Sequence, residues 1–479
     1  MQESPIDWPA VLGPILSSTE DPLDIQDLDR AVRCLPPRAV RRKPKLDVTS
    51  LPFPVTDVPW FEGGHFVPQD CRPGGFLNYL AGDYYVQDAG SMLPVALSNI
   101  GPGQLICDTC AAPGGKTTAI LEQLDGTGLL LANEVISSRM PALKQAIWRT
   151  GYGNCLTTSL DVEILAQRFP AQFDCVIVDA PCSGQSMLAR GKQSLAAFSD
   201  MQSRHSSARQ QRIIRAAAQL VKPLGKLVYS TCTFSYIENE AIVEQFLAEH
   251  ADWHAPPLDP RLQPWVSPIQ HGSYRLWPHR DNCAGGFAAI VQRQFSAEGS
   301  HVASHGFSQS PKHGRTKLNW QMMESPPEEV AAWFSLQSIE RVRAQFRWIQ
   351  VKDSILLVPA LADRWANSAD GVCVVAQRKA NRWQPLYASS VLDKRLLVPK
   401  FSITLSDEQA LAYVQGLSIG ALTSEQVQEQ SLESSRDGWC AVLWSGRALS
   451  WGKWVSGVLK NHFPKPLRQT NMQASPRGA

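Results

Sequence analysis

The sequence predicts an α/β fold, in which a doubly wound parallel sheet is joined by a small N-terminal module and a β-rich C-terminal region. From residue 105 onward, short apolar runs alternate with segments of helical periodicity, as expected for strands and helices that alternate along a parallel sheet. Residues 438–459 instead alternate small, apolar and aromatic side chains, as in twisted hairpins. A chain of 479 residues is also too long for one hydrophobic core, so several domains are expected.

Five segments are expected in order along the chain. Residues 1–82 are rich in proline and charge and form a small leading module, which precedes the sheet-forming domain at 83–295. Residues 296–317 contain many serines, glycines and histidines without apolar periodicity, as is typical of a linker. An intermediate module at 318–400 and a β-domain at 401–479 follow, and together they hold nine of the fifteen tryptophans.

The strands of the sheet are predicted from the apolar runs of the second segment. These runs cover residues 105–108, 129–133, 155–158, 173–179 and 226–230, with closing edge strands at 275–277 and 287–292. The intervening helices are expected from Lys116 onward and at 137–149, 203–220 and 238–250. Because ligands of such sheets bind at the carboxyl ends of the strands, the loops that follow the strands are the candidate functional segments.

Composition bears on where the protein works and what it contacts. The eleven cysteines have no regular spacing, which indicates free thiols in a reducing compartment. No apolar run is long enough to cross a membrane and Met1–Pro5 lacks the pattern of a secretory signal, so we expect a cytoplasmic protein without membrane contact. We also expect a monomer. Each of two basic clusters is either a polyanion contact or a solvated face. They comprise Arg33, Arg38, Arg41, Arg42, Lys43 and Lys45, and then Arg447, Lys453, Lys460, Lys465, Arg468 and Arg477.

A loop of small residues follows the first strand of the sheet. It consists of Cys110, Ala111, Ala112, Pro113, Gly114, Gly115 and Lys116. Small residues let the backbone approach a ligand just before a helix begins, which is the usual place of a nucleotide in this fold. The triplet that starts at Gly115 suggests a phosphate-binding loop, but that motif requires a glycine where Cys110 stands. The dinucleotide-binding glycine pattern is also missing, so an adenosine-type ligand without a phosphate chain remains.

Three carboxylates follow the next strands. Glu134 ends the second strand, where it can accept hydrogen bonds from both ribose hydroxyls, and Asp161 and Asp179 follow the third and fourth. Each alone is typical of a turn or a helix cap, but the ordered set fits S-adenosylmethionine best. A zinc site at Cys107 and Cys110 is not expected, because Cys107 lies on a buried strand and no second cysteine pair is near in the sequence. No metal is therefore expected.

Two cysteines fall just beyond neighbouring strand ends, Cys182 after the fourth strand and Cys232 after the fifth. Either one alone is typical of a small buried side chain. Together they place two thiols at the cofactor edge of the sheet. Carbon 5 of cytosine is a poor nucleophile until a thiolate adds to carbon 6, and a cationic cofactor and nearby helix N-termini favour that thiolate. The pair therefore indicates methylation of cytosine through a cysteine adduct.

Seven segments resemble the motifs of the RsmB/NOP/Sun family of RNA cytosine-C5 methyltransferases, over roughly residues 83–293. They are Gln87–Met92, Asp108–Thr117, Asp179–Gly184, Ser230–Thr233, Glu238–Glu240, and the closing Arg275–His279 with Gly285–Phe287. The resemblance implies a Rossmann-like class I methyltransferase core. It implies Cys232 as the nucleophile and Cys182 as the residue that assists product release. It also assigns Cys110–Lys116, Glu134, Asp161 and Asp179 to S-adenosylmethionine, and Asp179 also to the target base.

The C-terminal segment is similar to a PUA-like region. Gly438–Lys453 and Lys460–His462 resemble that region of the small-subunit rRNA methyltransferase F (RsmF) branch, which implies small-subunit rRNA or the assembling subunit as the partner. The resemblance implies that the leading module contacts RNA. The sequence of this module departs from the family pattern. Its Arg-x-Asn-Thr-Leu segment is missing, the nearest candidate being residues 41–46, and Gln185 replaces a common glutamate.

Three alternatives remain open from the sequence. The substrate could be tRNA rather than rRNA, the enzyme could act on DNA, or the chain could be an RNA-binding assembly factor without catalysis. The C-terminal segment favours rRNA. The pair of Cys182 and Cys232 argues against an inactive site, and the Thr-Cys motif at Cys232 argues against a DNA enzyme, which would use the Pro-Cys position.

Overall fold

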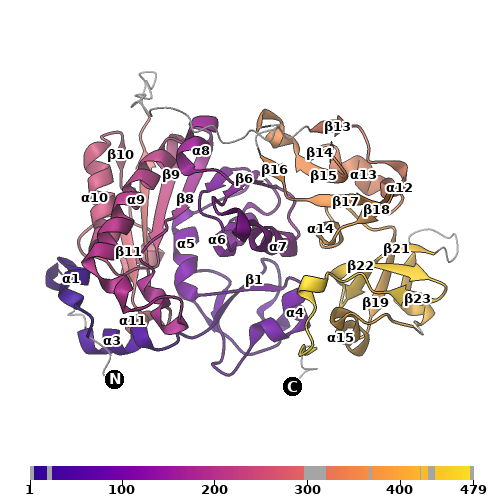
Figure 1. Cartoon of the computed structure of the whole chain (residues 1–479), viewed down its shortest axis with the longest axis horizontal. Coiled ribbons are helices and arrows are strands. Elements are labelled where there is room, and N and C mark those ends of the chain that lie inside the picture. The colour runs from indigo at the N-terminus through magenta and orange to yellow at the C-terminus, as the bar shows by residue number, and fades with distance from the viewer. Residues whose placement is uncertain are drawn as a thin grey trace.

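The computed structural model describes residues 5–18, 24–295, 320–365, 369–420, 422–429 and 437–474. A large mixed sheet with helices on both faces occupies one half of the molecule, and two smaller sheets of the C-terminal region occupy the other (Figure 1). The predicted linker at 296–317 lies outside the described residues. Among the described residues, no helix is both long and apolar enough to span a bilayer.

The large sheet confirms the predicted α/β fold. Its order is β10-β12-β9-β8-β5-β6-β7-β16, and β11 pairs with β12. Strands β5 to β8 are parallel, β9 continues that direction, and β12 closes it antiparallel. The strands are β5 (Leu105–Asp108), β6 (Leu129–Asn133), β7 (Cys155–Thr158), β8 (Phe173–Asp179), β9 (Val221–Thr231), β10 (Trp253–His254), β11 (Ser273–Leu276), β12 (Gly286–Arg293) and β16 (Asp370–Gly371).

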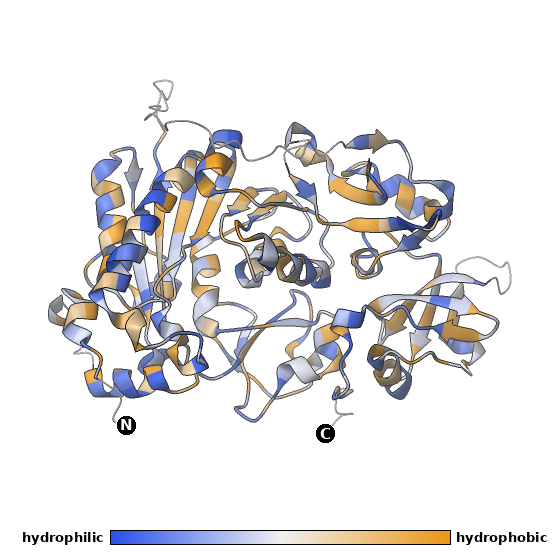
Figure 2. Ribbon diagram, viewed as in Figure 1, coloured by the Kyte–Doolittle hydropathy of each residue, from blue (hydrophilic) through white to orange (hydrophobic). Residues whose placement is uncertain are grey.

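Helices cover both faces of this sheet because its central strands are apolar on both sides. Most residues of β5 to β8 are buried, and Figure 2 shows these strands as largely hydrophobic while the outward faces of the helices are more hydrophilic. The helices are α5 (Leu93–Ser98), α6 (Gly115–Leu124), α7 (Met140–Thr150), α8 (Val162–Arg168), α9 (Asp200–Ala218), α10 (Glu240–Glu249) and α11 (Pro278–Asp281).

The leading module consists of a helical part and a small antiparallel sheet of order β2-β3-β1-β4. Its last strand lies beyond residue 82 and pairs with β1. The helical part packs beside α11 at one end of the molecule (Figure 1). The elements are α1 (Trp8–Leu12), α2 (Ile15–Ser18), α3 (Ile25–Arg33), β1 (Ala39–Arg42), β2 (Thr56–Asp57), β3 (Gly64–Phe66), α4 (Leu77–Leu80) and β4 (Tyr84–Gln87).

Arg41 joins the leading module to the large sheet. Its guanidinium is 1% exposed, and its Nε lies 2.6 Å from Oε2 of Glu122 on α6. It also donates to Gly115 O at 2.9 Å and to Thr118 Oγ1 at 2.7 Å, both in the first turn of α6. The expectation that Arg41 belongs to an exposed basic patch is wrong, because its charge is paired and buried inside the protein.

The intermediate module adds to the large sheet. Its own antiparallel sheet has the order β13-β14-β15-β17-β18, and its short strand β16 pairs with β7. Ile349, Val358 and Trp365 belong to the same apolar cluster as Phe173 of β8. The elements are β13 (Gln321–Met323), α12 (Glu328–Ala331), α13 (Leu336–Val342), β14 (Phe346–Val351), β15 (Ser354–Pro359), β17 (Val374–Lys379), β18 (Arg382–Pro385) and α14 (Tyr387–Ser390).

The C-terminal domain contains the predicted hairpins within a sheet of order β20-β19-β21-β22-β23. Leu77 and Leu80 of α4 pack into its core, and Arg447 pairs with Asp83 at 2.6 Å, so this domain also contacts the leading module. The elements are β19 (Phe401–Leu405), α15 (Asp407–Gln415), β20 (Val427–Glu429), β21 (Gly438–Trp444), β22 (Arg447–Val455) and β23 (Val458–Lys460).

Arg41→Ala should lower the free energy of unfolding by about 3 to 5 kcal/mol, because it leaves the buried Glu122 carboxylate unpaired. Urea denaturation followed by circular dichroism measures this change. Arg30→Ala is the matched control, since Arg30 pairs with Asp27 at 2.9 Å on the surface, and it should cost less than about 1 kcal/mol. Equal losses in the two variants would contradict a structural role for the Arg41 pair.

Candidate active site

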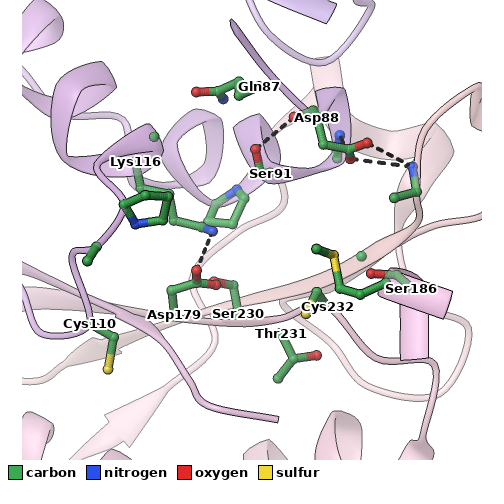
Figure 3. Close-up of a pocket in the computed structure, with 18 of the residues that line it drawn as sticks. Gln87, Asp88, Ser91, Cys110, Lys116, Asp179, Ser186, Ser230, Thr231 and Cys232 are labelled. Carbon is green, nitrogen blue, oxygen red and sulfur yellow. Dashed lines mark hydrogen bonds and ion pairs between the residues drawn. The ribbon is translucent and has the colours of Figure 1, made fainter. Parts of the chain in front are cut away.

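A cavity of about 560 Å³ opens at the carboxyl ends of β5, β8 and β9 (Figure 3). The loop after β5 forms one wall, and Asp179 and Cys232 at the ends of β8 and β9 form another. The rest of the wall comes from β4 and the segment after it, from the residues that begin β12, and from Ser186, Met187, Arg190 and Lys192. The cavity therefore lies where the fold predicts a ligand site, at the strand ends of a parallel sheet.

The predicted cofactor loop borders this cavity. Six of its seven residues line the cavity wall, and Gly114 packs beneath them against α7. Gly114 has φ +113°, and a Cβ there would lie 2.7 Å from Ala146 Cβ, so only glycine fits. The loop then enters α6 at Gly115, where a Cβ would approach Gln87 Oε1 to 3.3 Å. The glycines thus allow the backbone to run close to both α7 and the cavity.

Lys116 and Asp179 form an ion pair inside the cavity, with Nζ and Oδ2 2.7 Å apart. Ser230 Oγ donates to the other carboxylate oxygen, Oδ1, at 2.9 Å. Burial alone would lower the pKa of the Lys116 ammonium, but Asp179 and then Asp108 more than offset this, so its pKa is raised. Lys116 therefore stays cationic next to Cys232, whose pKa it influences.

Glu134 and Asp161, the other two predicted carboxylates, take different places. Glu134 lies behind the loop, with its side chain 3% exposed and paired with Arg139 at 3.2 Å. It accepts hydrogen bonds from the backbone N–H groups of Ile136 at 2.9 Å and Ala112 at 3.3 Å. Asp161 caps α8 by accepting from Glu163 N at 3.0 Å. The structure thus brings Glu134 to the cofactor loop and gives Asp161 a helix-capping contact.

The two predicted catalytic cysteines meet. Cys182 Sγ and Cys232 Sγ lie 3.3 Å apart, and Cys232 lines the cavity. The hydrogen bond with the Cys182 thiol lowers the pKa of Cys232, and Lys116 adds to this, while burial and Asp179 oppose it. The same contact, together with burial, raises the pKa of Cys182. The two shifts therefore favour the thiolate at Cys232 and the protonated thiol at Cys182.

Buried hydrogen bonds hold the loop that carries Cys182. Glu238, which is fully buried, accepts from Ser183 N at 2.9 Å, from Ser183 Oγ at 2.5 Å and from Gln210 Nε2 at 3.0 Å. Gln185 accepts from Phe234 N at 2.9 Å and donates to Ala197 O at 3.1 Å. A glutamate at position 185 could not donate that second bond, so the departure from the family motif suits the local contacts.

Sequence reasoning gave no role to three residues of the cavity wall. Asp88 accepts from Arg190 Nη2 at 2.8 Å and from the N–H of Gly90 at 2.9 Å, and Gln87 lies beside it. Burial raises the pKa of Asp88. Gln87 and Asp88 stand within the matched motif Gln87–Met92, which was the available signal. Arg190 had no such signal, because its partner is 102 residues away in the sequence.

The polar groups around the loop fit an adenosine-type ligand without phosphates. Asp108 Oδ1 and Gln87 Nε2 are buried and have no hydrogen-bond partner within the described part of the chain. Burial raises the pKa of Asp108 to about 6. Lys116, the cation of the loop, is already paired with Asp179 and does not extend toward a phosphate chain. No set of three or more His, Cys, Asp or Glu side chains in the described ranges is arranged to hold a metal ion.

Comparison with known proteins decides the family. Residues 95–292 match the 16S rRNA methyltransferase RsmB/F model, and residues 400–469 match the methyltransferase RsmF PUA domain. A ribosomal RNA small subunit methyltransferase F of Erwinia tasmaniensis is 32% identical over 86% of this chain and 85% of its own length. The chain belongs to the RsmB/F family of 16S rRNA methyltransferases. The two matches confirm the resemblance to this family that the sequence indicated. They also confirm the predicted methyltransferase fold with a C-terminal PUA domain.

Other relatives agree with the RsmB/F assignment. The methyltransferase F of Aeromonas salmonicida is 28% identical over 86% of this chain and 85% of its own length. The crystal structure of PH0851 superimposes with a TM-score of 0.52 at 25% identity, covering 56% of this chain and 62% of that chain. NSun6 from Pyrococcus horikoshii, solved with the S-adenosylmethionine analogue SFG, shares the fold, with a TM-score of 0.50 at 17% identity over 57% of this chain and 94% of that chain. S-adenosylmethionine is the cofactor of this family.

Glu134→Ala should weaken S-adenosylmethionine binding by about 1 to 3 kcal/mol, because it removes a charged acceptor behind the cofactor loop. Isothermal calorimetry with the cofactor alone measures the affinity. Asp200→Ala, which removes an exposed carboxylate on α9, should leave the affinity unchanged. An unchanged dissociation constant for the Glu134 variant would show that this carboxylate supports only the protein backbone.

Proposed function

We propose that the protein methylates carbon 5 of a cytosine in small-subunit rRNA, with S-adenosylmethionine as the methyl donor. The observation that carries the proposal is the contact of two cysteines at the cofactor cavity, 3.3 Å apart and with opposite pKa shifts. A methyltransferase that acts on an amine or a hydroxyl needs neither thiol. Methylation at an unreactive ring carbon needs a nucleophile, and a thiolate is the side chain suited to that task.

Cys232 is the proposed nucleophile. Its thiolate forms a bond to carbon 6 of the cytosine, and the electron pair of the C5–C6 double bond becomes available at carbon 5. S-adenosylmethionine, when bound, supplies an electrophilic methyl group. Carbon 5 uses its electron pair to bond that methyl group. Solvent then accepts the carbon 5 proton, the electron pair of the broken C–H bond re-forms the C5–C6 double bond, and the bond between carbon 6 and Sγ breaks with its electron pair on sulfur, which restores the Cys232 thiolate. Family membership supports this order, since the Thr-Cys motif stands at the end of β9.

Cys182 is the proposed release residue. Its thiol, the protonated member of the pair, can stabilise Cys232 Sγ by hydrogen bonding as the sulfur leaves carbon 6. The hydrogen bonds that Glu238 accepts from Ser183 fix the backbone next to Cys182, so the thiol stays directed at its partner. Removal of this thiol should therefore affect the end of the reaction and not its beginning.

Asp179 is the proposed contact of the target base. It lines the same cavity as Cys232, and its carboxylate can accept a hydrogen bond from the amino group that distinguishes cytosine from uracil. We also assign Cys110–Lys116, Glu134, Asp161 and Asp179 to the cofactor. Because Cys232 lines a cavity and does not lie on an open surface, the base must leave its stack to reach this sulfur.

The C-terminal domain is proposed to bind RNA, with the leading module as a second contact. Lys453 and Lys460 stand directly opposite each other on β22 and β23. Like charges in that arrangement destabilise a sheet, so their presence suits a polyanionic partner. Trp439 pairs with Lys453 on the other side and lies 4.5 Å from the His462 ring, which adds aromatic surface.

Cys182→Ala should trap the enzyme on RNA, because the adduct of Cys232 still forms but its breakdown slows. The measurement is a protein–RNA band that survives denaturing electrophoresis and requires S-adenosylmethionine. Cys232→Ala should abolish methylation while sparing cofactor binding, and the double variant should give no band.

Two controls separate this mechanism from its rivals. Cys283→Ala changes another buried thiol and should behave as wild type. An enzyme that attacks through the Pro-Cys position would lose its adduct on removal of Cys182, and a protein that only binds RNA would give no band in any variant. Either result would contradict the assigned roles.

Changing Lys453, Lys460 and Lys465 to alanine should weaken RNA binding and flatten its salt dependence by about one unit of slope for each phosphate that is no longer neutralised. No described carboxylate pairs with any of the three, whereas Arg447 is held by Asp83. Filter binding at several salt concentrations measures both effects. A slope equal to that of the wild type would mean that these lysines form only a solvated face.

A further inference from the structure

Ser186 lies next to Cys232, and the proposed reaction does not use it. It stands in the first turn of the short helix Gln185–Arg190, lines the same cavity as Cys232, and is 6% exposed (Figure 3). Its backbone N–H donates to the carbonyl oxygen of Cys232 at 3.2 Å, which ties the two residues together. Its Oγ is buried and has no hydrogen-bond partner among the described residues.

A buried hydroxyl without a partner is unfavourable, which makes its position next to a reactive sulfur informative. A hydroxyl can rotate and donate to an acceptor that forms nearby, and a thiolate is such an acceptor. Hydroxyl donors also differ from the Cys182 thiol in one respect. The serine proton does not titrate in the working range of pH, so Ser186 remains a donor when Cys182 exchanges its proton.

The groups around Cys232 act on its pKa in opposite directions, so a further hydrogen-bond donor would favour the thiolate. Cys182 donates to its sulfur and Lys116 contributes positive charge, while Asp179 and burial disfavour the thiolate. The Ser186 hydroxyl makes no hydrogen bond to this sulfur in the structure, but a bond donated by it would act in the same direction as the Cys182 thiol and lower the pKa of Cys232. Two donors on one sulfur would offset the desolvation that the cavity wall imposes.

We propose that Ser186 is a positioning residue whose hydroxyl donates to the Cys232 thiolate and increases the fraction of that thiolate. The inference rests on the proposed function, because it assumes that Cys232 is the nucleophile. The hydrogen bond between the Ser186 amide and the Cys232 carbonyl keeps the two residues adjacent, so that rotation of the Ser186 side chain can turn its hydroxyl toward the sulfur.

The test is the rate at which iodoacetamide alkylates Cys232, followed by peptide mass spectrometry from pH 6 to 10 on the full-length protein without RNA or cofactor. Ser186→Ala should move the midpoint upward by about one pH unit, so that the rate at pH 7 falls roughly tenfold. Ser206→Ala is the matched control, because Ser206 Oγ on α9 is also buried and unpartnered in the described structure but does not border Cys232. It should leave the midpoint unchanged.

A second pair of variants keeps the test valid if alanine disturbs folding. Ser186→Thr and Ser186→Val have the same shape and differ in the hydroxyl, so only the threonine variant should retain the low midpoint. Equal midpoints for this pair, or a wild-type midpoint for Ser186→Ala, would overturn the proposal. An increase in KM for RNA with no change in alkylation would also overturn it, because the hydroxyl would then contact the base.

This readout is independent of methylation. If the Cys182→Ala variant fails to trap RNA while Ser186→Ala still shifts the alkylation midpoint, the catalytic mechanism fails and the thiolate contact stands. If trapping occurs and the midpoint does not move, the mechanism stands and the role of Ser186 fails.

Discussion

The parallel pairing of β8 with β9 is the constraint on which the active site depends. Its register places Asp179 opposite Ser230, so the two strands end at the same level and their loops leave the sheet side by side. Cys182 and Cys232 are 50 residues apart in the sequence, yet this register brings their sulfur atoms into contact. In a sheet, a slip of one residue turns each side chain to the opposite face, so the two thiols would no longer meet. The buried Glu238 fixes the Pro-Cys loop at that level.

The two thiols also show how identical side chains acquire different chemistry from their neighbours. Both lie at the carboxyl edge of one sheet and both are largely desolvated. The contact between the two thiols lowers the pKa of Cys232 and raises that of Cys182, and the Lys116 ammonium adds to the shift at Cys232. The sulfur–sulfur contact is therefore the largest cause of both shifts. The proposed division of roles would be a property of the site and not of the cysteine itself.

Much of this arrangement could be predicted from the sequence, because strands that are buried on both faces are apolar runs and the loops after them carry the site. Strands β5 to β9, β11 and β12, the glycine-containing loop and the meeting of Cys182 with Cys232 were predicted in this way. Arg41 was not, because a run of basic residues looks the same whether exposed or buried, and its partner Glu122 is 81 residues away. The two-residue strand β16 was also missed, since it is too short to carry a periodic pattern.

The apolar core that fills one face of the large sheet continues into the intermediate module. Trp365 lies 5.4 Å from Phe169 and 5.3 Å from Phe173 between ring centroids, and Trp148 donates its indole N–H to Val372 O at 2.9 Å. The large sheet and the intermediate module therefore share buried surface. Neither can unfold without exposing apolar surface of the other. A substitution at Trp365, far from the cysteines, would lower the amount of folded enzyme in a cell through chaperones and proteases. Loss of activity from such a change would reflect protein abundance and not altered chemistry.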